Sequence, residues 1–175
     1  MKFRIPGSLA HRQVSRSMFL NSTPAETRPN KLVVGVLIFS SDRILLLQRA
    51  ATERFYPNIW ELPSGNVEIE DVTLLDAAAR ECFEETALTV TAFVAEGKSF
   101  KYSTSKGSTS LQLNFDVEVQ EGDHVIVNPE EHQAYQWCSE QEIEMVGVTD
   151  ATKEILKDSY ARRRRTARGK ENRSG

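Results

Sequence analysis

Cysteine and long apolar runs are scarce in this sequence of 175 residues. Its two cysteines, Cys82 and Cys138, provide neither a disulfide framework nor the paired spacing of a zinc site. No apolar run approaches the roughly 20 residues that a membrane-spanning helix needs, so no membrane partner is expected. The remaining composition, 27% charged and 39% hydrophobic, is typical of one soluble globular domain in a reducing compartment, and the cytoplasm is the expected location.

Positive charge is also scarce, except at the two ends of the chain. Residues 1–30 carry a net charge of +4 and residues 161–175 carry +6, so the total of −3 leaves −13 for residues 31–160. A protein that reads duplex nucleic acid would carry its positive charge on the folded surface instead. An acidic body of this kind suits a domain that binds cations, or that binds anions only through cations.

The two basic ends are predicted to lie outside the folded domain, which then spans residues 31–160. Residues 1–30 show no sustained periodicity and predict a flexible basic leader, and residues 161–175 predict a disordered basic tail. The arginine and serine content of the leader leaves mitochondrial import as an alternative location. The tail could be a nuclear localisation signal or a weak nucleic-acid tether, although nucleic acid is not expected to be the main partner.

Hydrophobic patterns within the acidic body predict strands on both sides of one central helix. The runs that suit strands are 31–40, 43–49, 59–65, 88–102, 108–119 and 132–138. Helices are predicted over 73–86, 139–146 and 148–163, the first with Thr73 as its N-cap. This order of elements indicates an α/β fold in which helices cover a mixed β-sheet.

The stretch RECFEETAL (80–88), which begins within the predicted 73–86 helix, crowds three glutamates beside one arginine. At about 100° per residue, Glu81, Glu84 and Glu85 share a sector that borders the buried stripe, with Arg80 on its flank. Like charges at this spacing destabilise an isolated helix by roughly 0.2–0.5 kcal/mol per pair. Partial burial would raise that cost unless a cation lay among the carboxylates.

Two interpretations of this acidic face are open. Most glutamate-rich helix segments are simply solvated. Against that interpretation, Arg80 is the only cation within one helical turn, and the preceding loop adds Glu68, Glu70 and Asp71 at the same end of the helix. Oxygen ligands that converge from a helix and a loop are what Mg²⁺ or Mn²⁺ requires, so the pattern favours a metal site.

Gly65 followed by RECFEETAL resembles the box motif of the Nudix hydrolases, in which a glycine and a spaced glutamate precede an Arg-Glu-x-x-Glu-Glu core. The segments LLLQR, WELPSG and EEHQAYQWCS also resemble that family, and the likeness extends over about residues 31–160. The resemblance implies an α/β/α sandwich with a mixed sheet. It also implies hydrolysis of a diphosphate linked to another group, usually a nucleoside, with Mg²⁺ or Mn²⁺ as the cofactor.

The resemblance implies a role for each charged residue of the box. Arg80 corresponds to the arginine that orients a box glutamate, and Glu81, Glu84 and Glu85 correspond to metal-ligating or water-activating carboxylates. Glu84 is the first choice for the general base. Glu131 is the runner-up, because EEHQAYQW resembles a stretch of the asymmetric dinucleoside tetraphosphate hydrolases in which a glutamate assists the metal. An exposed loop position is the alternative for Glu131.

Other residues are expected to contact the substrate or to have structural roles. Gly65 and Ser64, which replaces the first of two family glycines, correspond to the loop that lines the phosphates. Tyr102 is a candidate for stacking on a base, and Lys101 is a candidate for a phosphate contact. Lys101 could equally be a solubilising residue on a strand edge. A surface or structural role is expected for His132.

Two further departures from the family pattern lie within the box. The spacing from Gly65 to Arg80 is one residue longer, which resembles a variant of fungal members. This insertion places either Asp71 or Val72 at the position of the leading glutamate, and Asp71 is favoured because it keeps a carboxylate there. Ala87 replaces the glycine after the two glutamates, where a positive φ is freely accepted only by glycine.

The sequence therefore predicts a metal-dependent pyrophosphohydrolase that acts on a nucleoside diphosphate derivative. Dinucleoside polyphosphates or nucleoside triphosphates are favoured as the small-molecule substrate, while nucleotide sugars, ADP-ribose and coenzyme A stay open. The main alternative is a non-catalytic Nudix-like module that binds a nucleotide or RNA, which loss of box glutamates would have favoured. A hydrolase of RNA ends, tethered by residues 161–175, is a third possibility. The oligomeric state is not predicted.

Overall fold

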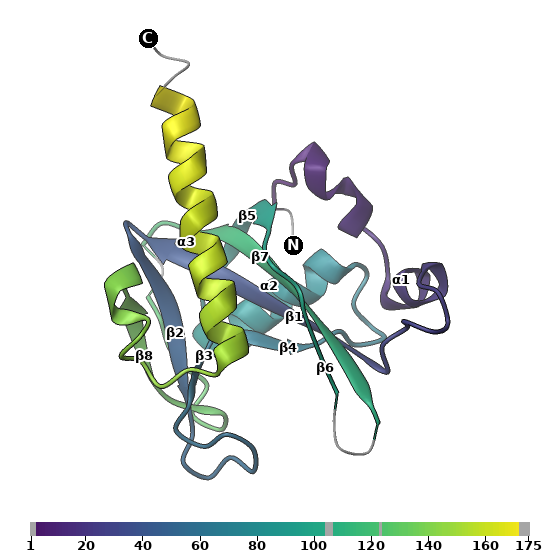
Figure 1. Ribbon diagram of the computed structural model, residues 1–175, viewed down its shortest axis with the longest axis horizontal. Coiled ribbons are helices and arrows are strands. Elements are labelled where there is room, and N and C mark those ends of the chain that lie inside the picture. The colour runs from purple at the N-terminus through teal and green to yellow at the C-terminus, as the bar shows by residue number, and fades with distance from the viewer. Residues whose placement is uncertain (1–2, 104–106, 123, 172–175) are drawn as a thin grey trace.

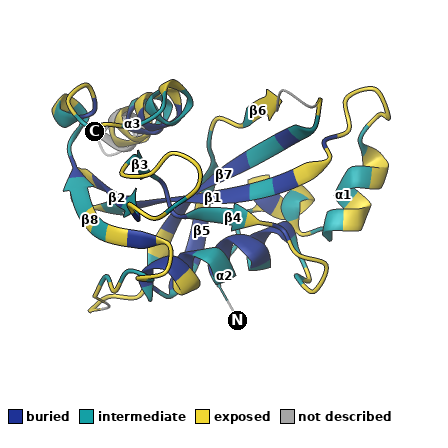
Figure 2. Cartoon of the chain, turned by 90° about the horizontal axis from the view of Figure 1, so that it is seen from below, coloured by how far each residue is buried: buried dark blue, intermediate teal, exposed yellow. Residues whose placement is uncertain are grey.

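The computed structural model describes residues 3–103, 107–122 and 124–171. In these residues one eight-stranded sheet has the order β3-β2-β1-β7-β5, with β4, β6 and β8 paired to β1, β7 and β2 respectively. The strands are β1 (Lys31–Ser40), β2 (Arg43–Arg49), β3 (Trp60–Glu61), β4 (Ser64–Asn66), β5 (Val90–Glu96), β6 (Phe100–Ser103), β7 (Thr109–Val119) and β8 (His132–Cys138). Helix α2 (Leu74–Thr86) covers one face of the sheet and α3 (Asp150–Glu171) covers the other (Figure 1, Figure 2). The predicted α/β/α sandwich with a mixed sheet is confirmed.

Strand β1 lies in the middle of the sheet because its sequence is apolar on both faces. Val34, Val36 and Ile38 join the larger hydrophobic core with α2, and Leu37 joins the smaller core with Leu156 of α3. A strand that is buried on both faces is a continuous hydrophobic run, which is why KLVVGVLIFS shows no alternation. β1 pairs in parallel with β7 and antiparallel with β2 and β4, so the sheet is mixed.

The strand predicted over 59–65 is in fact two short strands that pair with different neighbours. β3 pairs with β2, whereas β4 pairs with β1. Between them lies Pro63, which has no N–H for a sheet ladder, and its carbonyl accepts a hydrogen bond from the backbone N–H of Val36 at 2.9 Å. This crossing from β2 to β1 places Ser64 and Gly65 opposite β1 and against α2.

Helix α2 begins and ends where the sequence predicts. The Oγ1 atom of Thr73 accepts a hydrogen bond from the backbone N–H of Asp76 at 3.1 Å, which caps the first turn. Leu75 and Cys82 are fully buried in the larger core. The helix ends at Ala87, whose φ of 58° and ψ of 8° are left-handed. Alanine therefore adopts a glycine-type turn at this position, at a conformational cost.

Replacing Ala87 with glycine is expected to raise the free energy of unfolding by about 1 kcal/mol, because the left-handed conformation strains a residue that has a Cβ atom. Urea unfolding of the two proteins measures the difference. Ala79→Gly, in the buried interior of the same helix, is the matched control and should lower the free energy of unfolding by about 1 kcal/mol or more. A loss of stability in both variants would contradict this account of the turn.

The predicted flexible leader is corrected by the structure, which shows folded elements within residues 1–30. The described part of this segment forms a 3-10 helix, Gly7–Arg12, and helix α1, Arg16–Ser22. Leu9 is buried in the larger core, and the ring of Phe3 packs edge-on against a phenylalanine of β5. The apolar residues of the leader are irregularly spaced and show no periodicity, which is why the sequence pattern did not predict these contacts.

The predicted tail at 161–175 is also corrected, because α3 continues to Glu171. Leu156 and Tyr160 of this helix are buried, and two residues after Tyr160 the side chain of Arg162 donates to Asp116 of β7 at 2.8 Å. The last turns extend beyond the sheet (Figure 1). Residues 172–175 lie outside the described residues.

Two other predicted elements change their boundaries. The strand predicted over 88–102 is divided into β5 and β6, and the helix predicted over 139–146 is a single 3-10 turn, Glu140–Glu142. Ser139 still opens that turn, with a capping box to Glu142. Among the described residues, no helix has both the length and the apolar character that crossing a membrane requires.

Candidate active site

The candidate active site lies where one edge of α2 meets β4. The backbone N–H of Ser64 donates to Oε2 of Glu85 at 2.9 Å, and Glu85 is only 4% exposed. Gly65 lies so close to Glu81 that a Cβ atom on Gly65 would be 2.1 Å from Cδ of Glu81. The fold therefore brings the box glycine into contact with the box glutamates, and a side chain at position 65 would displace the carboxylate of Glu81.

Arg80 holds the surrounding carboxylates in place. Its Nε and Nη2 atoms donate to the two oxygens of Asp71 at 3.0 and 2.9 Å, and its Nη1 donates to Glu81 at 2.8 Å and to Glu84 at 2.9 Å. These contacts, above all the one with Asp71, raise the pKa of the guanidinium. Asp71, and not the exposed Val72, therefore faces Arg80 as the carboxylate that precedes the helix. Such a bidentate pair fixes the plane of the guanidinium.

Burial disfavours the ionised form of two glutamates of the site, Glu85 and Glu81. It raises the pKa of Glu85 well above the usual value, against the hydrogen bond from Ser64, and the carboxylates of Glu61, Glu81 and Glu131 add to the rise. Burial also raises the pKa of Glu81, although the contact with Arg80 opposes the shift. Both shifts arise from too much negative charge with too little solvent, a condition that a bound cation would relieve.

The raised pKa of Glu85 predicts a pH dependence of stability in the presence of a chelator. The folded state holds this proton more tightly than the unfolded state, so stability is lost as the pH rises from the ordinary glutamate pKa of about 4.3 through the folded value. Glu85→Gln cannot ionise. The free energy of unfolding of this variant minus that of the wild type should therefore grow between about pH 4 and pH 8. Urea unfolding across this range tests the prediction, and a difference that stays constant or shrinks would contradict it.

The opposite wall of the site is formed at the start of β8. One oxygen of Glu85, one oxygen of Glu131 and one nitrogen of His132 all lie within 4.8 Å of one another. The Nε2 atom of His132 is 3.2 Å from Oε1 of Glu61, which also accepts a hydrogen bond from Nη1 of Arg49 at 2.8 Å. Carboxylate oxygens and imidazole nitrogens are common ligands of divalent cations, so this group has the chemistry of a metal site.

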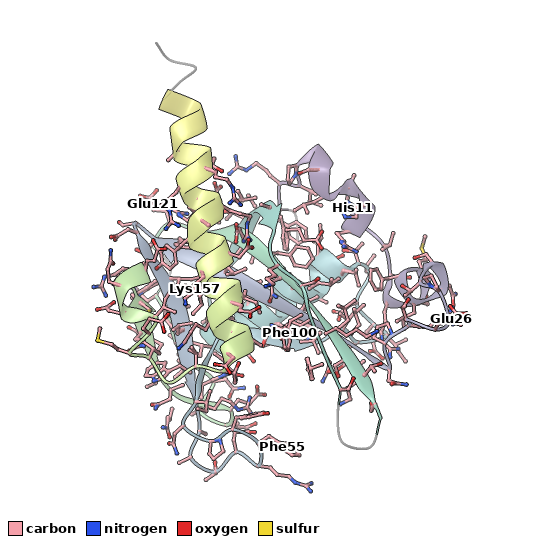
Figure 3. All side chains as sticks on the ribbon, viewed as in Figure 1. His11, Glu26, Phe55, Phe100, Glu121 and Lys157 are labelled. Atoms are coloured by element: carbon pink, nitrogen blue, oxygen red, sulfur yellow. The ribbon has the colours of Figure 1, made fainter. Side chains whose placement is uncertain are left out.

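Three of the predicted site residues lie apart from this group. Glu84 is half-exposed, and among the described residues its carboxylate is hydrogen-bonded and ion-paired to Arg80 alone. Lys101 donates to a backbone carbonyl at 3.1 Å, and Tyr102 stacks on Phe100 with the ring centroids 6.0 Å apart. Phe100 packs into the smaller core beside α3 (Figure 3). Within the part of the chain that the structure describes, neither Lys101 nor Tyr102 makes a hydrogen bond or ion pair with a box carboxylate.

Sequence reasoning missed two residues of the site, Glu61 and His132. Glu61 lies in WELPSG, where it stands alone, without the spacing to other carboxylates that marks the glutamates of α2. His132 follows Glu131 directly, yet its neighbours depend on the pairing of β8 with β2, where Arg49 is opposite His132. That register is a long-range property, so no local pattern predicts it.

A family model described as the NUDIX domain matches residues 29–159. This match covers most of the chain and includes every residue of the site described above. The chain therefore belongs to the NUDIX domain family, which confirms the resemblance found in the box motif.

Comparison with individual proteins agrees with this family. The solved structure of the Escherichia coli ORF135 protein has a TM-score of 0.66 and 25% identity, with 81% of this chain and 96% of that chain covered. The m7GpppN-mRNA hydrolase NUDT17 of Danio rerio is 41% identical over 70 residues, which are 38% of this chain and 23% of that protein. The RNA pyrophosphohydrolase of Bartonella tribocorum is 31% identical over 84 residues, 44% of this chain and 47% of that protein. The matches thus span a quarter to a half of these curated relatives.

Proposed function

We propose that this protein is a divalent-cation-dependent hydrolase that cleaves a diphosphate linkage in a nucleoside diphosphate derivative. The observation that carries the proposal is the convergence of three carboxylates, Glu81 and Glu85 from α2 and Glu131 from the start of β8. Glu85 is buried and Glu81 is half-buried, and negative groups that are withdrawn from water side by side destabilise a protein unless a cation joins them. A diphosphate is itself anionic, so a cation is also what would admit it to this acidic site.

Some residues of the site would bind the cation, and others orient the carboxylates that bind it. Glu81 and Glu85 would hold Mg²⁺ or Mn²⁺, which when bound neutralises the diphosphate and acidifies water. Arg80 fixes the carboxylate of Glu81, and the Ser64 N–H fixes that of Glu85. These contacts hold both carboxylates in place before a substrate arrives, which lowers the cost of orienting them during the reaction.

We assign the role of general base, which accepts the proton of the attacking water, to Glu131. Glu84 is the residue that the sequence favours for this role. One oxygen of Glu84 accepts a hydrogen bond from Arg80 at 2.9 Å. Glu131 is exposed, and its carboxylate has no hydrogen bond or ion pair among the described residues, although it lies beside Glu85. A carboxylate without another partner is free to accept the proton, as a general base requires.

Gly65→Ala is expected to lower kcat about 100-fold with little change in stability. The added Cβ would lie 2.1 Å from the carboxylate carbon of Glu81, which must move away, and a displacement of about 1 Å in a catalytic group costs roughly that factor. Because the atoms it meets are the end of a flexible side chain, the fold can accommodate the methyl group. Gly7→Ala, where a Cβ meets nothing within 4 Å, is the control. Wild-type activity in Gly65→Ala would contradict the placement of Glu81.

The substrate class is proposed from the chemistry shared by the similar proteins. Two of them are named for hydrolysis of capped mRNA and of RNA pyrophosphate, and both substrates carry a diphosphate linked to a nucleoside. The test is product release from capped RNA, 5′-triphosphorylated RNA, diadenosine tetraphosphate, nucleoside triphosphates and ADP-ribose, each with Mg²⁺ and with a chelator. Mg²⁺-dependent cleavage of at least one compound is expected. Tight binding without cleavage by the folded protein would instead indicate a non-catalytic module.

A further inference from the structure

We propose that His132 supplies a nitrogen ligand to the divalent cation, so that the metal site has a mixed nitrogen and oxygen donor set. The inference deepens the proposed function and rests on it. It is carried by one feature of the described residues, a polar atom that is buried without a partner. His132 is 1% exposed, and its Nδ1 atom makes no hydrogen bond.

The contacts of the other ring nitrogen define which tautomer is present. Nε2 lies 3.2 Å from Oε1 of Glu61, and a carboxylate can only accept a hydrogen bond, so Nε2 carries the proton. In the neutral ring Nδ1 then presents a lone pair. Arg49 donates to the same oxygen of Glu61 at 2.8 Å. This contact holds the carboxylate of Glu61 in place, and the carboxylate in turn holds the imidazole ring. A carboxylate that holds one nitrogen while the other faces a metal is a recurrent arrangement around metal-binding histidines.

The groups around His132 are carboxylates, which accept hydrogen bonds, whereas an unprotonated ring nitrogen needs a hydrogen-bond donor or a cation as its partner. A nitrogen of His132 and oxygens of Glu85 and Glu131 lie within 4.8 Å of one another. A lone pair and two carboxylates have no proton to share among themselves, and the burial of His132 and Glu85 makes a missing partner costly. One cation could bind the nitrogen and both carboxylates at once, whereas a water molecule has only two protons and could donate hydrogen bonds to at most two of them.

A nitrogen donor changes which cation the site prefers. Imidazole binds transition ions such as Mn²⁺ more readily than Mg²⁺, which favours oxygen ligands alone. His132→Gln should therefore weaken Mn²⁺ binding about 10-fold or more, with a smaller effect on Mg²⁺. His124→Gln, an exposed histidine on the loop before β8, is the matched control and should change neither affinity.

Electron spin-echo spectroscopy of bound Mn²⁺ tests the ligand directly, using the full chain labelled with ¹⁴N or ¹⁵N. The expected result is a nitrogen modulation that changes with the isotope, disappears in His132→Gln and persists in His124→Gln. Bound Mn²⁺ without a nitrogen modulation in the wild type would overturn the assignment of His132 while leaving the metal site intact. Failure of the folded wild type to bind Mn²⁺ would overturn the metal site itself. If His132→Gln does not fold, the isotope comparison in the wild type still decides whether a nitrogen of the protein binds the Mn²⁺.

Discussion

Glu85→Gln is expected to lower kcat about 1000-fold or more while leaving the free energy of unfolding at pH 7 unchanged or higher. The amide keeps the size of the carboxylate and can still accept the hydrogen bond from Ser64, but it lacks the charge that holds a cation. Burial raises the pKa of Glu85, so a neutral side chain suits the fold at least as well. Gain of stability with loss of activity is typical of a group that is retained for function.

The test combines steady-state kinetics on the preferred compound with urea unfolding. Glu70→Gln is the matched control, because Glu70 is exposed on the loop before α2 and the same charge is removed. It should keep most of the wild-type kcat. Wild-type kcat in Glu85→Gln would remove the basis of the proposed metal site, and a large loss of stability would mean that the carboxylate supports the fold.

Glu131→Gln is expected to lower kcat by about 100-fold to 10 000-fold, and Glu84→Gln by about 10-fold or less. A general base contributes a factor of this size when it takes a proton in the rate-limiting step. Glu131 lies within the cluster that contains Glu85, whereas Glu84 is half-exposed and held by Arg80. The same kinetic assay, performed on both variants at saturating substrate and Mg²⁺, measures the two effects side by side.

Glu130→Gln is the control for this comparison, because Glu130 is the exposed neighbour of Glu131 and its carboxylate makes no hydrogen bond or ion pair among the described residues. Its kcat should equal that of the wild type. A larger loss in Glu84→Gln than in Glu131→Gln would return the role of the base to Glu84, as the sequence alone suggested.

The central helix and its carboxylates were predictable from sequence because their determinants are local. Thr73 caps α2 with the side chain that the pattern identified, and the apolar spacing of Leu75 and Cys82 correctly oriented the buried face. Once that face was known, the positions of Glu81 and Glu85 along its border followed from helix geometry. The family pattern has a glycine at the position of Ala87, which indicates a left-handed turn there, but only the structure shows that alanine adopts it.

The parts that the sequence did not predict depend on contacts between distant segments. Leu9 joins a core built by β1 and α2, and the apolar residues of the leader show no periodicity that would predict this contact. His132 meets Glu61 only because β8 and β3 both pair with β2. The helical part of the predicted tail is anchored through Tyr160 and Arg162, which find partners on strands far away in sequence. The cytoplasmic location stays a prediction.

The most direct test of the central claim is to follow cleavage of the preferred compound in water enriched with ¹⁸O, with Mg²⁺ and with a chelator. Water attack on a diphosphate at this site predicts cation-dependent products, with one ¹⁸O atom in a phosphate group for each bond cleaved. Products that carry no ¹⁸O, or cleavage that persists in the chelator, would contradict it, as would a folded wild type that cleaves none of the compounds.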